Sequence, residues 1–197
     1  MLNNDQLEAA RHRIRQVAEE HMSVHGPDGI SLRKIAADLD WTAASLYRYY
    51  GSKAELVDAV CVDVINRFSD AIETAYHSTP DLWDRSRAVG NAFLAFARNE
   101  PAAYQLMSYR PATTNKHKSQ ALVLAEERSH DTLIRYVEDM VEAGLLDGDP
   151  VLIAHSFWAA MHGLIMLESS GKLANSPDFE ALRRAVLRLI ARGAQPD

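Results

Sequence analysis

Apolar residues recur three or four positions apart along almost the whole chain, and no segment alternates apolar and polar residues as a half-buried strand does. The first such stretch is interrupted at His25–Gly29, where glycine and proline gather. Two short stretches follow, and then a long one from Lys53 to Tyr76, which as a helix would be roughly 35 Å long. Five further helices are expected, which begin at or near Pro80, Ala102, Leu122, Pro150 and Pro177. The pattern predicts an all-α protein, with a polar loop at Arg110–Lys118.

Helix starts can be predicted from residues that accept hydrogen bonds from free backbone N–H groups. Thr42 is placed to cap one short helix, and Ser52 with Glu55 forms the pattern of a capping box before the long helix. Pro80 is expected at the first position of its helix, and Asp149 as the cap before Pro150. These residues set the expected boundaries of the elements.

The segment from Ser31 to Lys53 predicts a helix-turn-helix. Leu32, Ile35 and Leu39 give its first helix one apolar face, and the pattern breaks just before Thr42. The second helix directs Leu46 inward. Small, hydroxyl, aromatic and basic side chains remain outside on this helix, and a DNA major groove accepts such a surface.

The same residues carry a resemblance to a known family. Gly29–Ala36 (Gly-Ile-Ser-Leu-Arg-Lys-Ile-Ala) and Leu46–Lys53 (Leu-Tyr-Arg-Tyr-Tyr-Gly-Ser-Lys) resemble the amino-terminal DNA-binding domain of TetR-family transcriptional regulators, over about residues 14–60. The chain departs from the family pattern at Tyr49, where a histidine is usual, and at Tyr50, where phenylalanine is common. Both departures keep an aromatic ring.

The resemblance implies a set of contacts with double-stranded operator DNA. Arg33 would reach a base edge, and Lys53 with Tyr49 would hold phosphate. The other members of the set would meet bases, thymine methyl groups, sugars or phosphates. The full implied set is Arg33, Thr42, Ala43, Ala44, Ser45, Tyr47, Arg48, Tyr49 and Lys53.

The net charge of −6 and the isoelectric point of about 5.7 argue against a protein that coats DNA without sequence preference. The charge is uneven, because residues 1–53 carry a net charge of 0 and the remainder carries −6. Salt screens the distant acidic part over roughly 8–10 Å. A focused DNA site in the first segment is therefore compatible with the acidic composition.

Composition narrows the other possibilities. Cys61 is the only cysteine, so no disulfide forms within the chain, and the polar first residues predict no signal peptide and a cytoplasmic protein. His21 and His25 lie four residues apart, but the sequence offers no third ligand, so no metal site is expected. No phosphate-binding glycine loop or nucleophile elbow is present, and the sequence predicts no cofactor and no catalytic residues.

The helix expected at Val151–Leu167 is apolar nearly all round. A membrane span would show this pattern, but the run is short, contains two histidines and stands alone. A soluble helix that is apolar on every side is buried on every side, most simply against the same surface of a second subunit. Ala159, Ala160 and Gly163 would let two helices approach closely. We therefore expect a homodimer, completed by the last helix, and no membrane partner.

A second resemblance concerns the same region. Trp158–Gly163 (Trp-Ala-Ala-Met-His-Gly), with Pro101–Met107 (Pro-Ala-Ala-Tyr-Gln-Leu-Met), resembles the carboxy-terminal domain type of the TetR family that is marked by a Trp…His-Gly motif. It implies a dimer and names no ligand.

Aromatic and methionine side chains are abundant in the second part of the chain. Core packing explains most of them, but together they can also wall a cavity, since methionine adapts to irregular ligands. The family resemblance favours a cavity for a small-molecule effector. Its expected lining is Phe93, Phe96, Tyr104, Met107, Trp158, Met161 and His162.

Together these features predict a helix-turn-helix head at residues 1–52 and a helical effector-binding and dimerisation domain at 53–197. The expected function is a ligand-responsive transcriptional regulator, most simply a repressor that a small apolar or amphipathic molecule releases from its operator. Two alternatives stay open at this point. One is an all-helical enzyme or binding module with a vestigial head, and the other is a constitutive DNA-binding dimer.

Overall fold

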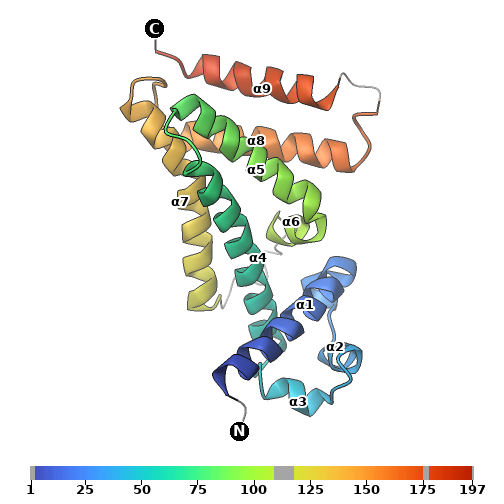
Figure 1. The fold of residues 1–197 in the computed structure, drawn as a ribbon. Helices are drawn as coiled ribbons and strands as arrows, with labels where there is room; N and C mark the ends of the chain where they lie inside the picture. The colour runs from blue at the N-terminus through green and yellow to red at the C-terminus, as the bar shows by residue number, and fades with distance from the viewer. Residues whose placement is uncertain (1–2, 109–117, 175–177, 197) are drawn as a thin grey trace. The chain divides into compact units, whose positions relative to one another are not determined.

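The computed structural model describes residues 3–108, 118–174 and 178–196, and all regular structure within them is helical (Figure 1). This confirms the predicted all-α fold. The helices are α1 (Asn4–Gly29), α2 (Leu32–Asp38), α3 (Ala43–Tyr47), α4 (Lys53–Tyr76), α5 (Leu82–Asn99), α6 (Pro101–Ser108), α7 (Gln120–Glu142), α8 (Pro150–Ser169) and α9 (Phe179–Gly193).

The chain forms two compact units, and α4 and α7 each contribute to both. Unit 1 comprises residues 1–67 and 100–127, and unit 2 comprises residues 68–99 and 128–197. The DNA-binding head expected at residues 1–52 therefore packs as part of a larger unit that includes α6. The division at residue 52 stays a prediction about function.

The core of unit 1 is built around α1. Ile14, Ala18 and Met22 are fully buried on one face of this helix, and Ile35 and Leu46 from the two short helices are buried as well. The capping box of Asn3 with Gln6 starts α1. Its helical conformation breaks at Gly26, whose φ of 69° is left-handed, so the expected interruption lies where the breakers gather.

The start of α4 differs in one detail from the expected capping box. The backbone N–H of Glu55 donates to the Ser52 hydroxyl at 3.1 Å, as expected. The Glu55 carboxylate, however, accepts from the N–H of Gly51 at 2.8 Å, one residue before the cap. The two side chains still satisfy two backbone donors at the helix entry.

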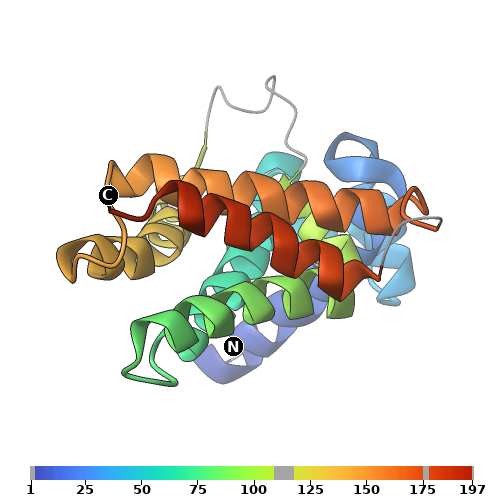
Figure 2. The same ribbon diagram turned by 90° about the horizontal axis from the view of Figure 1, so that it is seen from above.

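In unit 2, α8 contacts both α5 and α9, and α9 packs along α8 (Figure 2). Phe68 is fully buried, and its ring meets Phe93 and Phe96 edge-on, with 5.3 Å between centroids in each pair. None of the residues of α9 is fully buried. The backbone N–H of Asp147 donates to the carbonyl of Ala194 at 2.7 Å, which ties the end of α9 to the turn before α8.

Some expected boundaries need correction. Pro80 does not open α5, because Asp81 caps this helix through the N–H of Asp84 and places the proline before it. The Asp149 side chain caps α8 as expected, because its carboxylate accepts hydrogen bonds from the backbone N–H groups of Val151 and Leu152. Pro177 and the loop at Arg110–Lys118, apart from Lys118 itself, lie outside the described residues.

Among the described residues, α8 is the one helix long and apolar enough to span a membrane by length and composition. A core helix of a soluble protein meets the same test, and Ile153, Phe157 and Met161 of α8 are buried within unit 2. The test alone is weak support for a membrane span, and the absence of a membrane partner stays a prediction.

Candidate nucleic-acid interface and ligand cavity

The turn between α2 and α3 gives the helix-turn-helix its shape. Asp40 has a positive φ of 58°, and no other non-glycine residue in the part of the chain that the structure describes does so. This conformation turns the chain after Leu39. The N–H of Trp41 then bonds to the Ala36 carbonyl at 2.8 Å. Thr42 caps α3, because its hydroxyl accepts from the N–H of Ser45 at 3.1 Å. The cap predicted from the sequence is confirmed.

The structure places the predicted DNA-contacting residues on one short stretch, with different degrees of exposure. The buried side of α3 is held by Leu46, which is fully buried. The exposed members of the set are Arg33, Thr42, Ala44, Tyr47 and Arg48. The half-buried members are Ala43, Ser45, Tyr49 and Lys53. Tyr47 is the most prominent aromatic residue, with 52% of its surface exposed.

Several of these side chains already have partners within unit 1. The hydroxyls of Thr42 and Ser45 lie 2.9 Å apart, and the Tyr49 ring stacks on Trp41 with 5.4 Å between centroids. The Lys53 ammonium donates to the carbonyl of Asp28 at 2.5 Å. Lys53 therefore joins the start of α4 to the end of α1, a contact that helical spacing does not reveal.

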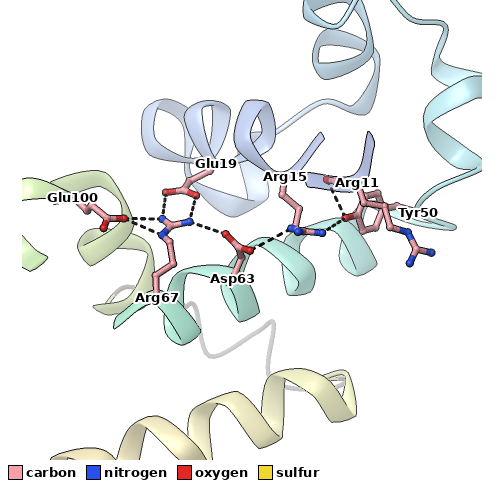
Figure 3. Close-up of polar contacts among 7 residues, drawn as sticks. All are labelled: Arg11, Arg15, Glu19, Tyr50, Asp63, Arg67 and Glu100. Atoms are coloured by element: carbon pink, nitrogen blue, oxygen red, sulfur yellow. Dashed lines mark hydrogen bonds and ion pairs between the residues drawn. The ribbon is translucent and has the colours of Figure 1, made fainter. Parts of the chain in front are cut away.

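A chain of charged groups fixes α4 against α1 (Figure 3). The Arg67 guanidinium bonds to Glu19 at 2.8 Å, to Asp63 at 2.7 Å and to Glu100 at 3.0 Å. Burial alone would lower the pKa of Arg67, but its bonds to Glu19 and Glu100 outweigh burial and raise it above its usual range. Arg67 therefore stays charged and joins α1, α4 and the start of α6.

The same chain of polar contacts continues from Asp63 to Tyr50, which directly follows the predicted DNA-contacting residue Tyr49 (Figure 3). Asp63 faces the Arg15 guanidinium at 3.5 Å, and Arg15 donates to the Tyr50 hydroxyl at 3.3 Å. Tyr50 is buried directly after α3, and its hydroxyl also donates to the carbonyl of Arg11 at 3.5 Å. The hydroxyl that distinguishes Tyr50 from the usual phenylalanine thus gains two contacts with α1.

Unit 2 contains a cavity of about 540 Å³, a size typical of sites for small organic ligands. Residues of α5, α7, α8 and α9 line it. Trp83, Phe93, Leu133, Phe157 and Met161 form much of its apolar wall.

The cavity overlaps only partly with the lining expected from the sequence. Phe93, Trp158 and Met161 line it, whereas Phe96, Tyr104, Met107 and His162 do not. Phe96 packs on Phe68, Tyr104 is buried within unit 1, and Met107 lines a space of about 20 Å³ beside Cys61 in unit 1. Helical periodicity shows which face is buried, but it does not show where buried faces leave a space between them.

Sequence reasoning missed the charged wall of this cavity. Five arginines line it, namely Arg87, Arg183, Arg184, Arg188 and Arg192. A signal was present, since Arg184, Arg188 and Arg192 are four residues apart and therefore share one face of α9. The apolar stripe of this helix predicts its packed side but not the cavity beside it.

Comparison with known proteins defines the family. Residues 86–190 match the family described as "Tetracyclin repressor-like, C-terminal domain", and residues 14–60 match "Bacterial regulatory proteins, tetR family". The chain belongs to the TetR family. The second match covers α2 and α3, and the first covers most of the helices that line the cavity.

Two bacterial proteins illustrate the sequence similarity of this chain to known regulators. The HTH-type transcriptional regulator Rv1816 of Mycobacterium tuberculosis is 31% identical over 109 residues, 54% of this chain and 45% of that protein. The chain thus spans about half the length of that relative. The tetracycline repressor protein class D of Escherichia coli is 26% identical over 171 residues, 85% of this chain and 71% of that protein.

A solved structure of a Rhodococcus sp. RHA1 protein, described as of unknown function, has the same arrangement of helices. It superposes with a TM-score of 0.80 at 25% identity, and the match covers 94% of this chain and 95% of that one. The shared fold therefore extends over nearly the entire chain.

His21, one of the two histidines spaced four residues apart on α1, pairs with a carboxylate of α2. His21 Nε2 lies 2.6 Å from the Asp38 carboxylate, and Asp38 comes from α2 rather than from the helix that carries the histidines. Within the described residues, no group of three or more histidine, cysteine or acidic side chains is arranged to hold a metal ion. Cys61 is buried.

Proposed function

We propose that this TetR-family protein is a ligand-responsive transcriptional regulator that binds operator DNA as a homodimer. The observation that carries the proposal is the exposed surface of α2 and α3. Arg33, Tyr47 and Arg48 project from a helix-turn-helix whose inward side is fixed by Leu46. Guanidinium groups recognise guanine edges and phosphates, and aromatic rings contact thymine methyl groups and sugars.

Repression is the simplest form of regulation for such a protein, and the likeness to the tetracycline repressor protein class D supports it. The protein acts in the cytoplasm, where it meets the operator. An enzymatic role has less support, because the two family models that match the chain describe regulatory proteins and a repressor-like domain.

The homodimer is supported by the exposed side of α8. Leu152, Trp158 and Met166 are 66%, 46% and 44% exposed within one chain, and Leu189 of α9 is 70% exposed. A Cβ atom added at Gly163 of the same helix would meet no atom within 4 Å. A second copy that packs there would bury these apolar side chains about a two-fold axis. Two heads could then reach major grooves about 34–36 Å apart, one turn of DNA.

The coupling between ligand and operator runs through α4 in this proposal. Phe93 lines the cavity and contacts Phe68, and the next residue of α4 is Arg67. Arg67 binds Glu19 of α1, which belongs to the head. A ligand that displaces Phe93 would rotate α4, change the spacing of the two heads and weaken the fit to successive grooves.

The proposal is tested with DNA from the region flanking the gene, in a fluorescence anisotropy titration of the full chain. Arg33→Ala is expected to cost about 1–3 kcal/mol of binding free energy and to relax sequence preference. Lys53→Ala is expected to weaken binding evenly across sequences and to reduce the salt dependence. Arg13→Ala is the matched control, because Arg13 is an exposed arginine of α1 outside the proposed contacts.

If Arg33→Ala and Lys53→Ala bind this DNA with unchanged affinity and unchanged salt dependence, the assignment of the interface fails. If wild-type protein binds the DNA but no small molecule ever changes its affinity, the protein is a constitutive DNA-binding dimer.

A further inference from the structure

The cavity in unit 2 has a charge that the rest of the chain does not share. Its lining contains five arginines and neither aspartate nor glutamate, although the chain as a whole carries a net charge of −6. The arginines come from two helices, with Arg87 on α5 and the others on α9. A positive wall in an acidic protein points to a negatively charged occupant.

Two of the five arginines are neutralised by neighbours on their own helices. Arg87 pairs with Asp84, and Arg183 pairs with Glu180 at 2.8 Å. The side chains of Arg184, Arg188 and Arg192 form no hydrogen bond or ion pair with any part of the chain that the structure describes. Their positions, four residues apart, place successive Cα atoms about 6 Å apart along the axis of α9, on one face of the helix. These three arginines are free to bind an anion.

The part of the lining that comes from α7 and α8 is apolar, with one exception. Tyr136 of α7 is only 7% exposed and lines the cavity, and its hydroxyl has no hydrogen-bond partner among the described residues. Burial raises the pKa of this phenol above its usual range, so it remains a neutral donor. Because Tyr136 borders the cavity, an occupant of the cavity could supply a partner for its hydroxyl.

We propose that the effector is an amphipathic anion, with an apolar chain against Trp83, Phe93 and Phe157 and a carboxylate or phosphate head held by the free arginines of α9. This proposal deepens the proposed function, on which it rests, by giving the chemical class of the effector. A guanidinium holds carboxylate and phosphate oxygens through two parallel hydrogen bonds, which a neutral alcohol does not offer.

The test is a ligand series that keeps the chain constant and changes only the head. Decanoate, decyl phosphate, decanol and decyltrimethylammonium are titrated into the protein below their micelle concentrations. Binding is followed by tryptophan fluorescence, because Trp83 and Trp158 line the cavity, and is repeated by calorimetry. We expect the better of the two anions to bind about 10- to 100-fold more tightly than decanol, as expected for hydrogen bonds between charged groups. The ratio between decanoate and decyl phosphate identifies the head.

Substitutions at Arg188 and Gly90 test where the ligand binds. Arg188→Gln is expected to remove most of the preference for the anion, whereas Arg188→Lys should retain part of it. Arg13→Gln, at an exposed position of α1, should leave the preference unchanged. Gly90→Leu should abolish binding of every member of the series. Gly90 lies on the cavity wall, and an added Cβ there meets no atom within 4 Å, so the backbone has room for a side chain that would extend into the cavity. Because leucine also favours the helix, the variant should melt at or above the wild-type temperature.

Equal affinity for decanoate, decyl phosphate and decanol overturns the proposal, and so does an Arg188→Gln variant that keeps the anion preference. Binding that survives in folded Gly90→Leu would place the ligand elsewhere and also overturn it. Operator binding is measured on the same samples to separate the two proposals. A neutral compound that releases operator DNA upholds the proposed function and rejects the anionic effector. An anion that binds the cavity and leaves operator affinity unchanged upholds the ligand class and rejects the coupling.

Discussion

At the scale of single residues, Asp40 carries the turn of the helix-turn-helix in a backbone conformation that most side chains avoid. Its φ of 58° is left-handed, which aspartate tolerates better than a β-branched residue does. Asp40→Val is therefore expected to lower the free energy of unfolding by about 1–2 kcal/mol, and Asp40→Gly to leave it unchanged or raise it. Urea denaturation measures both. Ala37→Val, at an exposed helical position of α2, controls for the β-branched side chain itself. Equal losses in the two valine variants would show that the turn stores no strain.

The residues of the head show how far local patterns predict contacts. The cap at Thr42 and the inward side chain of Leu46 follow from spacing alone, and both are confirmed. The bond from Lys53 to the carbonyl of Asp28 joins residues 25 positions apart, so no helical pattern contains it. The free arginines of α9 lie between these cases, because their spacing is visible in the sequence but the cavity they face is not.

At the scale of elements, the contact between α1 and α4 depends on Arg67. Its guanidinium is the shared partner of Glu19, Asp63 and Glu100, which would otherwise repel one another. Arg67→Met is expected to lower the free energy of unfolding by about 1–2 kcal/mol, after allowance for the solvent that reaches this half-buried group. The loss should become smaller at high salt, because screening reduces the repulsion among the carboxylates.

Chemical denaturation at two salt concentrations measures the effect of Arg67→Met. Arg13→Met is the control, since Arg13 is exposed on α1 and no described residue forms an ion pair with it. A loss in Arg67→Met no larger than in Arg13→Met would mean that the ion pairs of Figure 3 add nothing to the stability of unit 1.

The helices also show which features of the fold sequence patterns do not predict. The apolar residues of α8 on all sides predict a helix with two covered faces, and the structure shows one of them, built from Ile153, Phe157 and Met161. The prediction that Pro80 opens α5 is wrong, because proline is suited both to the first turn of a helix and to the residue before its cap. Asp81 decides between the two positions through its bond to the N–H of Asp84.

At the scale of the whole molecule, the homodimer predicts the effect of a charge on the exposed face of α8. Gly163→Asp would place an uncompensated carboxylate between two apolar surfaces, and this should shift the protein from dimer to monomer. Sedimentation velocity measures the shift. Ala95→Asp, at an exposed position of α5, is the control and should leave the dimer intact. A wild-type protein that sediments as a monomer at micromolar concentration would contradict the dimer itself.

In the proposed function, binding of a ligand in the cavity and binding of the operator are coupled. A ligand that lowers operator affinity 100-fold has a coupling free energy of about 2.7 kcal/mol, and the operator must then weaken ligand binding by the same factor. Phe68→Leu keeps the core of unit 2 apolar but removes the ring that meets Phe93 and Phe96. We expect this variant to bind decanoate alone and operator alone within about threefold of wild type, while their coupling falls toward zero, since the remaining side chain transmits less of the displacement. The measurement is a pair of titrations, operator with and without decanoate and decanoate with and without operator.

Ile72→Val is the matched control, because Ile72 is fully buried one turn further along α4 and its shortening should cost about 0.5–1.5 kcal/mol of stability without loss of coupling. Coupling that persists in Phe68→Leu, or that fails equally in both variants, would mean that the signal does not pass through this ring.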